Sequence, residues 1–451
     1  MTTSHRPTTP VALAGADPRQ TNIKGSINWS ARLPPLFSRA RELVEQATGT
    51  NLSGIQLHLV DDQQINEEVR HETSLLVNSQ FENTDFQDHF LASIMENQAG
   101  TYAALYNGRH KSVMVSRNLM ESYTASLPSE PQVQDAALMA LMIHELVHAA
   151  DDQRFHIHKK RVLSFRASFA QSATFEGHAQ WQTRNICSEA GCLAGLDALD
   201  NFMFSRNNES SQLTQSVQAI SRNVLEYSYI EGEHFIAALA ARPNGDALIK
   251  HLLRSPPSDP IQVLNPDSFP DTARELRNQK LIRAGTGVAH PWLDKHWVAV
   301  DTSPLKGVNL QSDPERRRAA IDGFTRLITA MVALQLYDQS VPDQFPLEVT
   351  VLQTDVESTA SLFASTLHAN TKAADTIFDT VQLRHISDSG IPLTLTLFRT
   401  VMRDDSSVPW RTVIGVVGQH VVQIAGFAKS DIEMENYVVR VLAHIRNNST
   451  T

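Results

Sequence analysis

Residues 131–152 read PQVQDAALMALMIHELVHAADD and include the densest apolar run of the chain, at 136–143. The apolar residues and the two histidines recur every three or four positions, which is the spacing of one broad helix face. Pro131 suits the first turn of a helix, with Ser129 as its cap. The residues on this face are Val133, Ala136, Ala137, Ala140, Leu141, His144 and His148. The sequence therefore predicts a helix from Pro131 to about Asp152.

The segments before this helix predict a small unit with both helix and strand. Residues 33–48 have an amphipathic helical pattern, and residues 55–60 alternate as a strand does. Two β-rich runs, 101–106 and 112–116, flank Asn107–Gly108, a dipeptide that favours a tight hairpin turn. We therefore expect a β-hairpin directly before the histidine-bearing helix, with one strand available to bind extended substrate.

After this helix, the chain is expected to remain mostly helical for about a hundred residues. Residues 162–187 and 213–241 carry helical patterns, and the basic stretch HIHKKR at 156–161 is expected to be a solvated loop. The segment 254–271 is rich in proline and predicts loops.

We predict two folded domains of an α+β protein. The expected order is a disordered lead-in at 1–30, a mostly helical domain with a small β-sheet at 31–275, a linker at 276–312, and a smaller α+β domain at 313–451. In this last domain we expect helices at 313–337, 355–369 and 431–446, and strands at 347–352, 380–384, 392–401, 413–417 and 421–426.

Charge and composition narrow the possible partners and locations. The chain has 451 residues and a net charge of −10, which argues against nucleic acid or an anionic membrane as the main partner. No segment reaches the roughly 20 apolar residues of a transmembrane helix, and no signal peptide is visible. These features predict a cytoplasmic protein if Met1 is the true start, and an extracytoplasmic one remains open if the N-terminus is trimmed. Cys187 and Cys192 are expected to be reduced thiols, with a small disulfide as the alternative.

The pentad His144-Glu145-Leu146-Val147-His148 carries the chemistry. Positions i and i+4 of a helix lie about 5–6 Å apart on one face, so two imidazoles can meet one tetrahedral zinc ion. Glu145 lies one step round the helix, too displaced to be a ligand but close enough to take a proton from a zinc-bound water. The alternative is a helix with two surface histidines.

A catalytic zinc usually has three protein ligands and one open position. The best candidate for the third is Glu176, on the next predicted helix, where Gly177 would allow a close approach. The alternatives are His178, His156 and His158. On a helix, His178 lies about 200° round from Glu176, so the two cannot both face the metal.

Further polar residues are candidates to support the reaction. Asp152, or less favourably Asp151, could orient a histidine or hold the loop after the helix. Tyr229 and His234 are candidates to donate a hydrogen bond to a tetrahedral oxyanion, as is Tyr227. The alternative for all three is ordinary helix packing, although Gly232 indicates a close approach between helices.

Four segments in the same order resemble a bacterial family of gluzincin-like zinc metallopeptidases. They are HELVHAADDQRF, ATFEGHAQW, YSYIEGEHFIAAL and PPSDPIQVLNPDSF, and together they cover about residues 140–270. The resemblance implies a zincin-like domain, one zinc on His144, His148 and Glu176, and Glu145 as general base. It also implies that the helix of Tyr229 lies near the site. The chain departs from the family pattern at His178 and in the last block, which puts the substrate groove in doubt.

The sequence therefore predicts a metal-binding hydrolase, a zinc metallopeptidase that acts on peptides or proteins. Zinc would polarise the scissile carbonyl and Glu145 would transfer the proton. One alternative is a catalytically silent binding protein of this fold, and another is a zinc amidase acting on a non-protein amide. In the leading hypothesis, the C-terminal domain would recruit a substrate or another partner.

Overall fold

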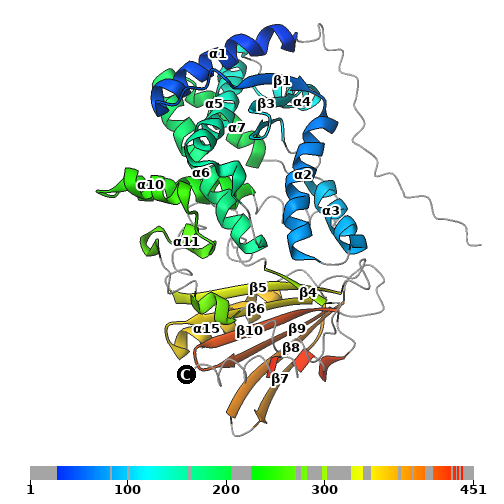
Figure 1. Ribbon diagram of the computed structural model, residues 1–451. Helices are drawn as coiled ribbons and strands as arrows, with labels where there is room; N and C mark the ends of the chain where they lie inside the picture. Colours follow the sequence, from blue (N-terminus) through cyan, green and yellow to red (C-terminus); the bar gives the residue numbers. More distant parts are fainter. Residues whose placement is uncertain are drawn as a thin grey trace, which may run out of the picture.

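The computed structural model places two regions one above the other, a helical region and a seven-stranded sheet (Figure 1). The described helices and strands together make this an α+β protein, as expected. The residues that the structure describes are 28–81, 84–98, 102–128, 130–160, 164–204, 225–270, 276–281, 297–301, 327–338, 347–373, 377–388, 391–401, 410–427, 430–432, 434–435 and 438–439.

The helix α5 (Pro131–Phe155) forms the centre of the helical region. It is buried on nearly every side, as expected for a helix with apolar residues all round, because three other helices pack against it. Its N-cap is Glu130, with no side-chain bond, so the prediction of a Ser129 cap is wrong. The packing helices are α1 (Trp29–Thr48), α6 (Phe165–Ala190) and α7 (Leu193–Phe204).

The expected N-terminal elements are present, with changed boundaries. α1 extends the predicted 33–48 helix back to Trp29, so residues 29 and 30 of the expected lead-in are helical. Residues 1–27 lie outside the described part of the chain. Three further helices surround the small sheet, namely α2 (Asp62–Gln80), α3 (Thr84–Gln98) and α4 (Arg117–Ser126).

A three-stranded sheet lies beside α5, in the order β1-β3-β2. β1 pairs with β3 in parallel, and the predicted hairpin of β2 and β3 is confirmed. The predicted tight turn at Asn107–Gly108 is wrong, because Asn107 pairs with Ser112 across a four-residue connection. The Asn107 side chain accepts the amide hydrogens of Arg109 and His110 in this turn, at 3.0 Å each. The strands are β1 (Gln56–Val60), β2 (Ala104–Asn107) and β3 (Ser112–Ser116).

Two glycines allow α6 to cross the later helical segment at very short range. A Cβ atom on Gly177 would lie 2.2 Å from the backbone carbonyl carbon of Gly232. The close approach predicted at Gly232 is thus confirmed. Gly177 forms the other side of this crossing, whereas the sequence predicted that Gly177 would let its helix approach the metal ion closely. The later segment consists of a π-helical turn, η2 (Glu226–Glu231), continued by α9 (Gly232–Ala240). Residues 213–224 of the predicted helix lie outside the described residues.

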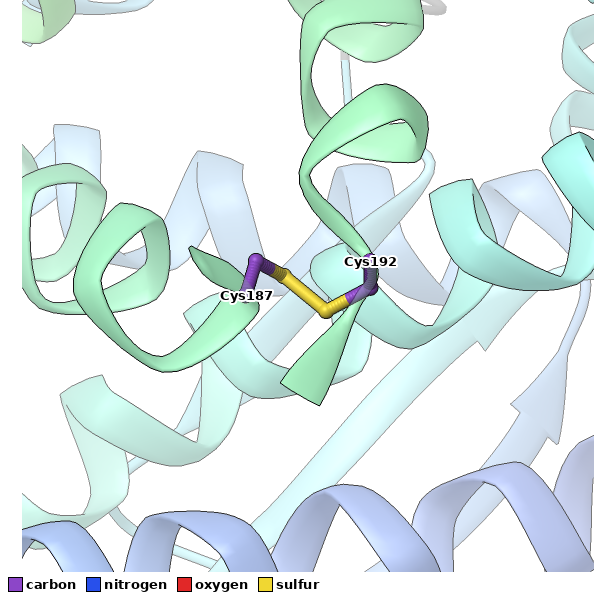
Figure 2. The surroundings of a disulfide bond; sticks show 2 residues. All are labelled: Cys187 and Cys192. Carbon is purple, nitrogen blue, oxygen red and sulfur yellow. A yellow bond between two sulfur atoms is a disulfide. The ribbon is translucent and has the colours of Figure 1, made fainter. Parts of the chain in front are cut away.

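A disulfide between Cys187 and Cys192 joins the end of α6 to the start of α7 (Figure 2). Between them, Gly191 adopts the left-handed conformation, and the Cys192 amide donates to the Cys187 carbonyl at 3.0 Å. The expectation of reduced thiols is therefore wrong, and the alternative reading is confirmed. Spacing alone could not decide, because five residues of helix end can place two cysteines near or far from each other.

The seven-stranded sheet is antiparallel throughout, in the order β4-β5-β6-β10-β9-β8-β7. The five strands predicted between 347 and 426 are all confirmed, and α15 (Glu357–Ala373), which packs on the sheet, confirms the helix predicted at 355–369. The described residues between 431 and 439 are helical. The confirmed strands are β6 (Leu347–Thr354), β7 (Ile377–Asp388), β8 (Ile391–Val401), β9 (Trp410–Val417) and β10 (His420–Phe427).

Two expectations about the start of this region are wrong. β5 (Ile328–Asp338) is a strand where the sequence predicted the helix 313–337, and 313–326 lie outside the described residues. Its apolar run is nearly unbroken because the strand is buried on both faces, so periodicity could not separate strand from helix. β4 (Trp297–Asp301) pairs with β5 from within the expected linker.

Buried contacts join the helical region to the sheet. Asp259 accepts hydrogen bonds from Arg166 of α6 at 2.5 Å and from Asn278 at 2.6 Å, and Asn278 in turn accepts the amide of Met331 in β5 at 3.0 Å. Ile261, at the start of the short helix α11 (Ile261–Leu264), packs into the apolar core of the sheet. The helix that carries Glu176 is thereby connected to the sheet. Among the described residues, no helix has the length and apolar character to cross a membrane.

Candidate metal centre

Three side-chain atoms from two helices converge in the helical region. α5 presents His144 and His148 on one face, one turn apart, and their Nε2 atoms are 3.1 Å from each other. Glu176 of α6 places Oε2 at 3.1 Å from His144 Nε2 and at 3.2 Å from His148 Nε2. These residues form a group that can hold a metal ion. The structure thus brings together the two histidines and the carboxylate that the sequence singled out.

The three groups are largely shielded from water. The side chains of His144 and His148 are 6% and 12% exposed, and that of Glu176 is 26% exposed. Buried polar groups of this kind need hydrogen-bond partners. Here each of the three side chains contacts the other two. The alternative of two surface histidines is therefore wrong.

The cluster is strongly coupled electrostatically. Burial would lower the pKa of His148, but the carboxylate of Glu176 outweighs it and raises that pKa to about 9. Burial would raise the pKa of Glu176, but the charge of His148 and hydrogen bonds from both histidines hold it far below its usual range. Without metal, the pair is a protonated imidazole beside a carboxylate. A cation that binds here must displace that proton.

Glu145 faces the small sheet rather than the three convergent atoms. It is 7% exposed, and its Oε2 accepts the backbone N–H of Tyr106 in β2 at 2.7 Å. Burial is the main cause that raises the pKa of Glu145. One oxygen of this carboxylate is thus held by the edge strand, and its affinity for a proton is increased by burial.

Two tyrosines flank the cluster. The ring of Tyr229, in the π-helical turn, stacks on His144 with 5.6 Å between ring centres. Burial and then the carboxylate of Glu176 raise its pKa well above normal, and Tyr229 is hydrogen-bonded to Glu176. Tyr102, just before β2, has a pKa raised to about 12 by burial and by Glu176. Both phenols therefore stay protonated and can donate a hydrogen bond.

The rival ligands have other partners. His178 Nδ1 lies 2.6 Å from Asp151 Oδ2, away from the convergent atoms. His158 pairs with Asp152 through Nδ1 and through its backbone amide, the latter at 3.1 Å. His156 caps α5 in the left-handed conformation, with φ of 54°. The basic stretch is thus partly anchored to α5.

The remaining candidates take different places. Asp152 bonds to the amide and the ring of His158 and so holds the loop after α5, the second of the two roles predicted for it. His234 is about half exposed and lies 3.8 Å from Glu231, so the structure does not bring it to the cluster. Tyr227 is buried and donates to the Pro260 carbonyl at 2.8 Å, as its packing alternative predicts.

Sequence reasoning missed Tyr106, Tyr102 and the Asp151–His178 pair. The register of the hairpin decides that the Tyr106 amide points at α5, and this register depended on a turn that the sequence predicted wrongly. The sequence offered one signal for these residues, namely that Tyr102 and Tyr106 are both aromatic and both lie in the predicted strand 101–106.

Comparison with protein-family models, curated proteins and solved structures gave no match. Inference about function therefore depends on the site itself.

Proposed function

We propose that the chain is a zinc-dependent metallopeptidase of the gluzincin type, with His144, His148 and Glu176 as ligands and Glu145 as general base. The observation that carries this proposal is the convergence of the three ligand atoms beside a separately held, buried carboxylate. A structural metal site would not need Glu145 in that place.

The spacing of the donors supports zinc. Two ligand atoms at ordinary bonding distances from one tetrahedral zinc ion lie about 3.4 Å apart. The three pairs of atoms here are 3.1, 3.1 and 3.2 Å apart, close to the edges of such a tetrahedron. Two imidazoles and a carboxylate are also a donor set that zinc accepts in hydrolases, with its fourth position open.

The chain's own residues account for the proton transfers. Bound zinc would act as a Lewis acid toward the scissile carbonyl and would acidify water. Glu145 Oε2 is held by Tyr106, which leaves its other oxygen to take the proton from the attacking water and to pass it to the leaving amine. Tyr229 would redirect its hydroxyl hydrogen bond from Glu176 to the oxyanion, and its raised pKa keeps the hydroxyl protonated for this.

The edge strand supports a peptide as the substrate. The Ser116 amide donates to the Ala103 carbonyl, and hydrogen-bonded and open pairs alternate along an antiparallel ladder. The backbone groups of Ala104 and Tyr106 therefore point away from β3. Since Tyr106 already donates to Glu145, we infer that an extended peptide would pair with the N–H and C=O of Ala104, a residue that is 6% exposed in the substrate-free protein.

Cleavage of denatured casein by zinc-loaded protein tests this proposal. Glu145→Gln keeps the shape and the hydrogen bond from Tyr106 but removes the base, so it should retain zinc and lose at least about 100-fold in kcat. Glu67→Gln, an exposed position on α2, is the matched control and should cleave as the wild type does. Zinc-loaded wild type that cleaves no peptide would favour the silent binding protein or the amidase.

A further inference from the structure

One tyrosine connects the edge strand to α5 at two points. The backbone N–H of Tyr106 donates to Glu145 Oε2 at 2.7 Å, and its hydroxyl donates to Asp152 Oδ2 at 3.0 Å. Glu145 and Asp152 are seven residues apart, so they lie on the same side of α5 two turns from each other. Tyr106 therefore lies along the helix, with its amide at one carboxylate and its hydroxyl at the other.

The carboxylate of Asp152 is itself held in place by other groups. The Asp152 side chain is 3% exposed and accepts the His158 amide at 3.1 Å, and it pairs with the His158 ring. The hairpin turn packs against His158, the residue that pairs with Asp152. A Cβ atom on Gly108 would lie 2.6 Å from His158 Cβ. Asp152, His158 and the hairpin turn thus form one buried contact that does not include the metal-binding atoms.

The inner contact faces the reacting group. An edge-strand amide that points outward would otherwise be open to water or to a bound peptide. Here it is donated to the carboxylate that the proposed reaction uses as a base. The position of that carboxylate therefore depends on the position of β2, which is held by its ladder with β3 and by the bond between the Tyr106 hydroxyl and Asp152.

We propose that Tyr106 is a positioning residue for Glu145, anchored through its hydroxyl by Asp152 and His158. The inference rests on the proposed function of Glu145 and adds a residue from outside the metal-binding helices. The amide and hydroxyl of Tyr106 donate to Glu145 and Asp152, and neither of these carboxylates belongs to the group of three convergent ligand atoms. Tyr106 acts by keeping its own backbone N–H in hydrogen-bonding position to Glu145 Oε2.

Removal of the hydroxyl is the direct test. Tyr106→Phe keeps the ring and the backbone, so zinc content and KM should stay near wild type while kcat on a peptide substrate falls by about tenfold. Tyr123→Phe is the matched control, because the Tyr123 hydroxyl is buried without a hydrogen-bond partner among the described residues, and kcat should not change. Asp152→Asn, which keeps an oxygen acceptor, should retain more activity than Asp152→Ala.

Amide hydrogen exchange distinguishes failure of this inference from failure of the proposed function. The Tyr106 amide should exchange slowly in wild type and at least about tenfold faster in Tyr106→Phe, whether or not a substrate is present. A kcat in Tyr106→Phe within twofold of an active wild type, or unchanged exchange, would contradict the positioning role alone. A zinc-loaded wild type without any cleavage would contradict the proposed function, and the positioning role with it.

Discussion

The two regions of the molecule use their buried space differently. In the helical region, α5 buries His144, Glu145, Asp151 and Asp152, each with a polar partner on α6 or on β2. The core of the seven-stranded sheet is apolar, with residues such as Met331, Leu352 and Val421. Burial in this sheet lowers the pKa of His420.

We infer from this difference that the helical region carries the reactive groups and that the sheet stabilises the fold. Buried ionisable groups reduce stability unless they are paired, so a cluster of them is retained where it has a chemical role. An apolar sheet gives rigidity without reactive groups. Asp259 and its partners connect the two, so that α6 is held from the sheet side. We expect perturbations of the helical region to change metal binding, and perturbations of the sheet to change stability alone.

The largest effect is expected where α6 crosses α9. Gly177→Ala would place a methyl group 2.2 Å from backbone atoms of Gly232, and backbone cannot move aside as a flexible side chain can. We expect a loss of about 3 kcal/mol in the free energy of unfolding, together with weaker metal binding, because Glu176 is the neighbouring residue. Chemical denaturation and metal titration measure both.

Gly54→Ala is the control for this substitution, since a Cβ there meets nothing within 4 Å. If Gly177→Ala were as stable as Gly54→Ala, the close crossing of the two helices would be incorrect.

The next effect concerns protons and metal. Because Glu176 holds the pKa of His148 at about 9, a metal ion must displace one proton at any pH below that value. The apparent affinity for zinc should therefore rise about tenfold per pH unit, or about 100-fold between pH 6 and 8. Competition with a chelator of known affinity measures it. An affinity independent of pH over this range would show that His148 is neutral in the metal-free protein.

A smaller effect is expected from the disulfide, which belongs to the helical region alone. Reduction of Cys187–Cys192 opens a short loop between α6 and α7 and should cost about 2 kcal/mol there. Hydrogen exchange should accelerate at the end of α6 and stay unchanged in β9 and β10. Equal acceleration in both regions would mean that they unfold together.

The smallest effect belongs to the sheet. Burial lowers the pKa of His420 from 6.5 to about 4, so the unfolded state binds a proton that the folded state does not. The contribution of His420 to the free energy of unfolding is therefore fully present well above pH 6.5. It is lost as the pH drops toward 4, and the loss is about 1.4 kcal/mol at pH 5.5. His420→Gln should remove this part of the pH dependence, as read from exchange in β9 and β10. An equal dependence in the variant would assign it to other groups.

The sequence predicted the elements whose signals are local. The pair His144 and His148 follows from helical spacing, and the strands from β6 to β10 follow from alternation. β5 was predicted as a helix because its apolar residues are buried on both faces and carry no period. The Tyr106–Glu145 bond depends on hairpin register and on packing between segments 39 residues apart, which no local pattern specifies.

The central claim is most directly tested by elemental analysis of the purified protein after incubation with zinc and removal of excess metal. Wild type should retain about one zinc ion per chain, and Glu176→Ala should retain far less, because a carboxylate that completes the ligand set is missing. Glu233→Ala, which removes a carboxylate of α9 that pairs with Arg184 of α6, should keep its zinc. Wild type without bound zinc, or Glu176→Ala with a full complement, would contradict the metal centre described above.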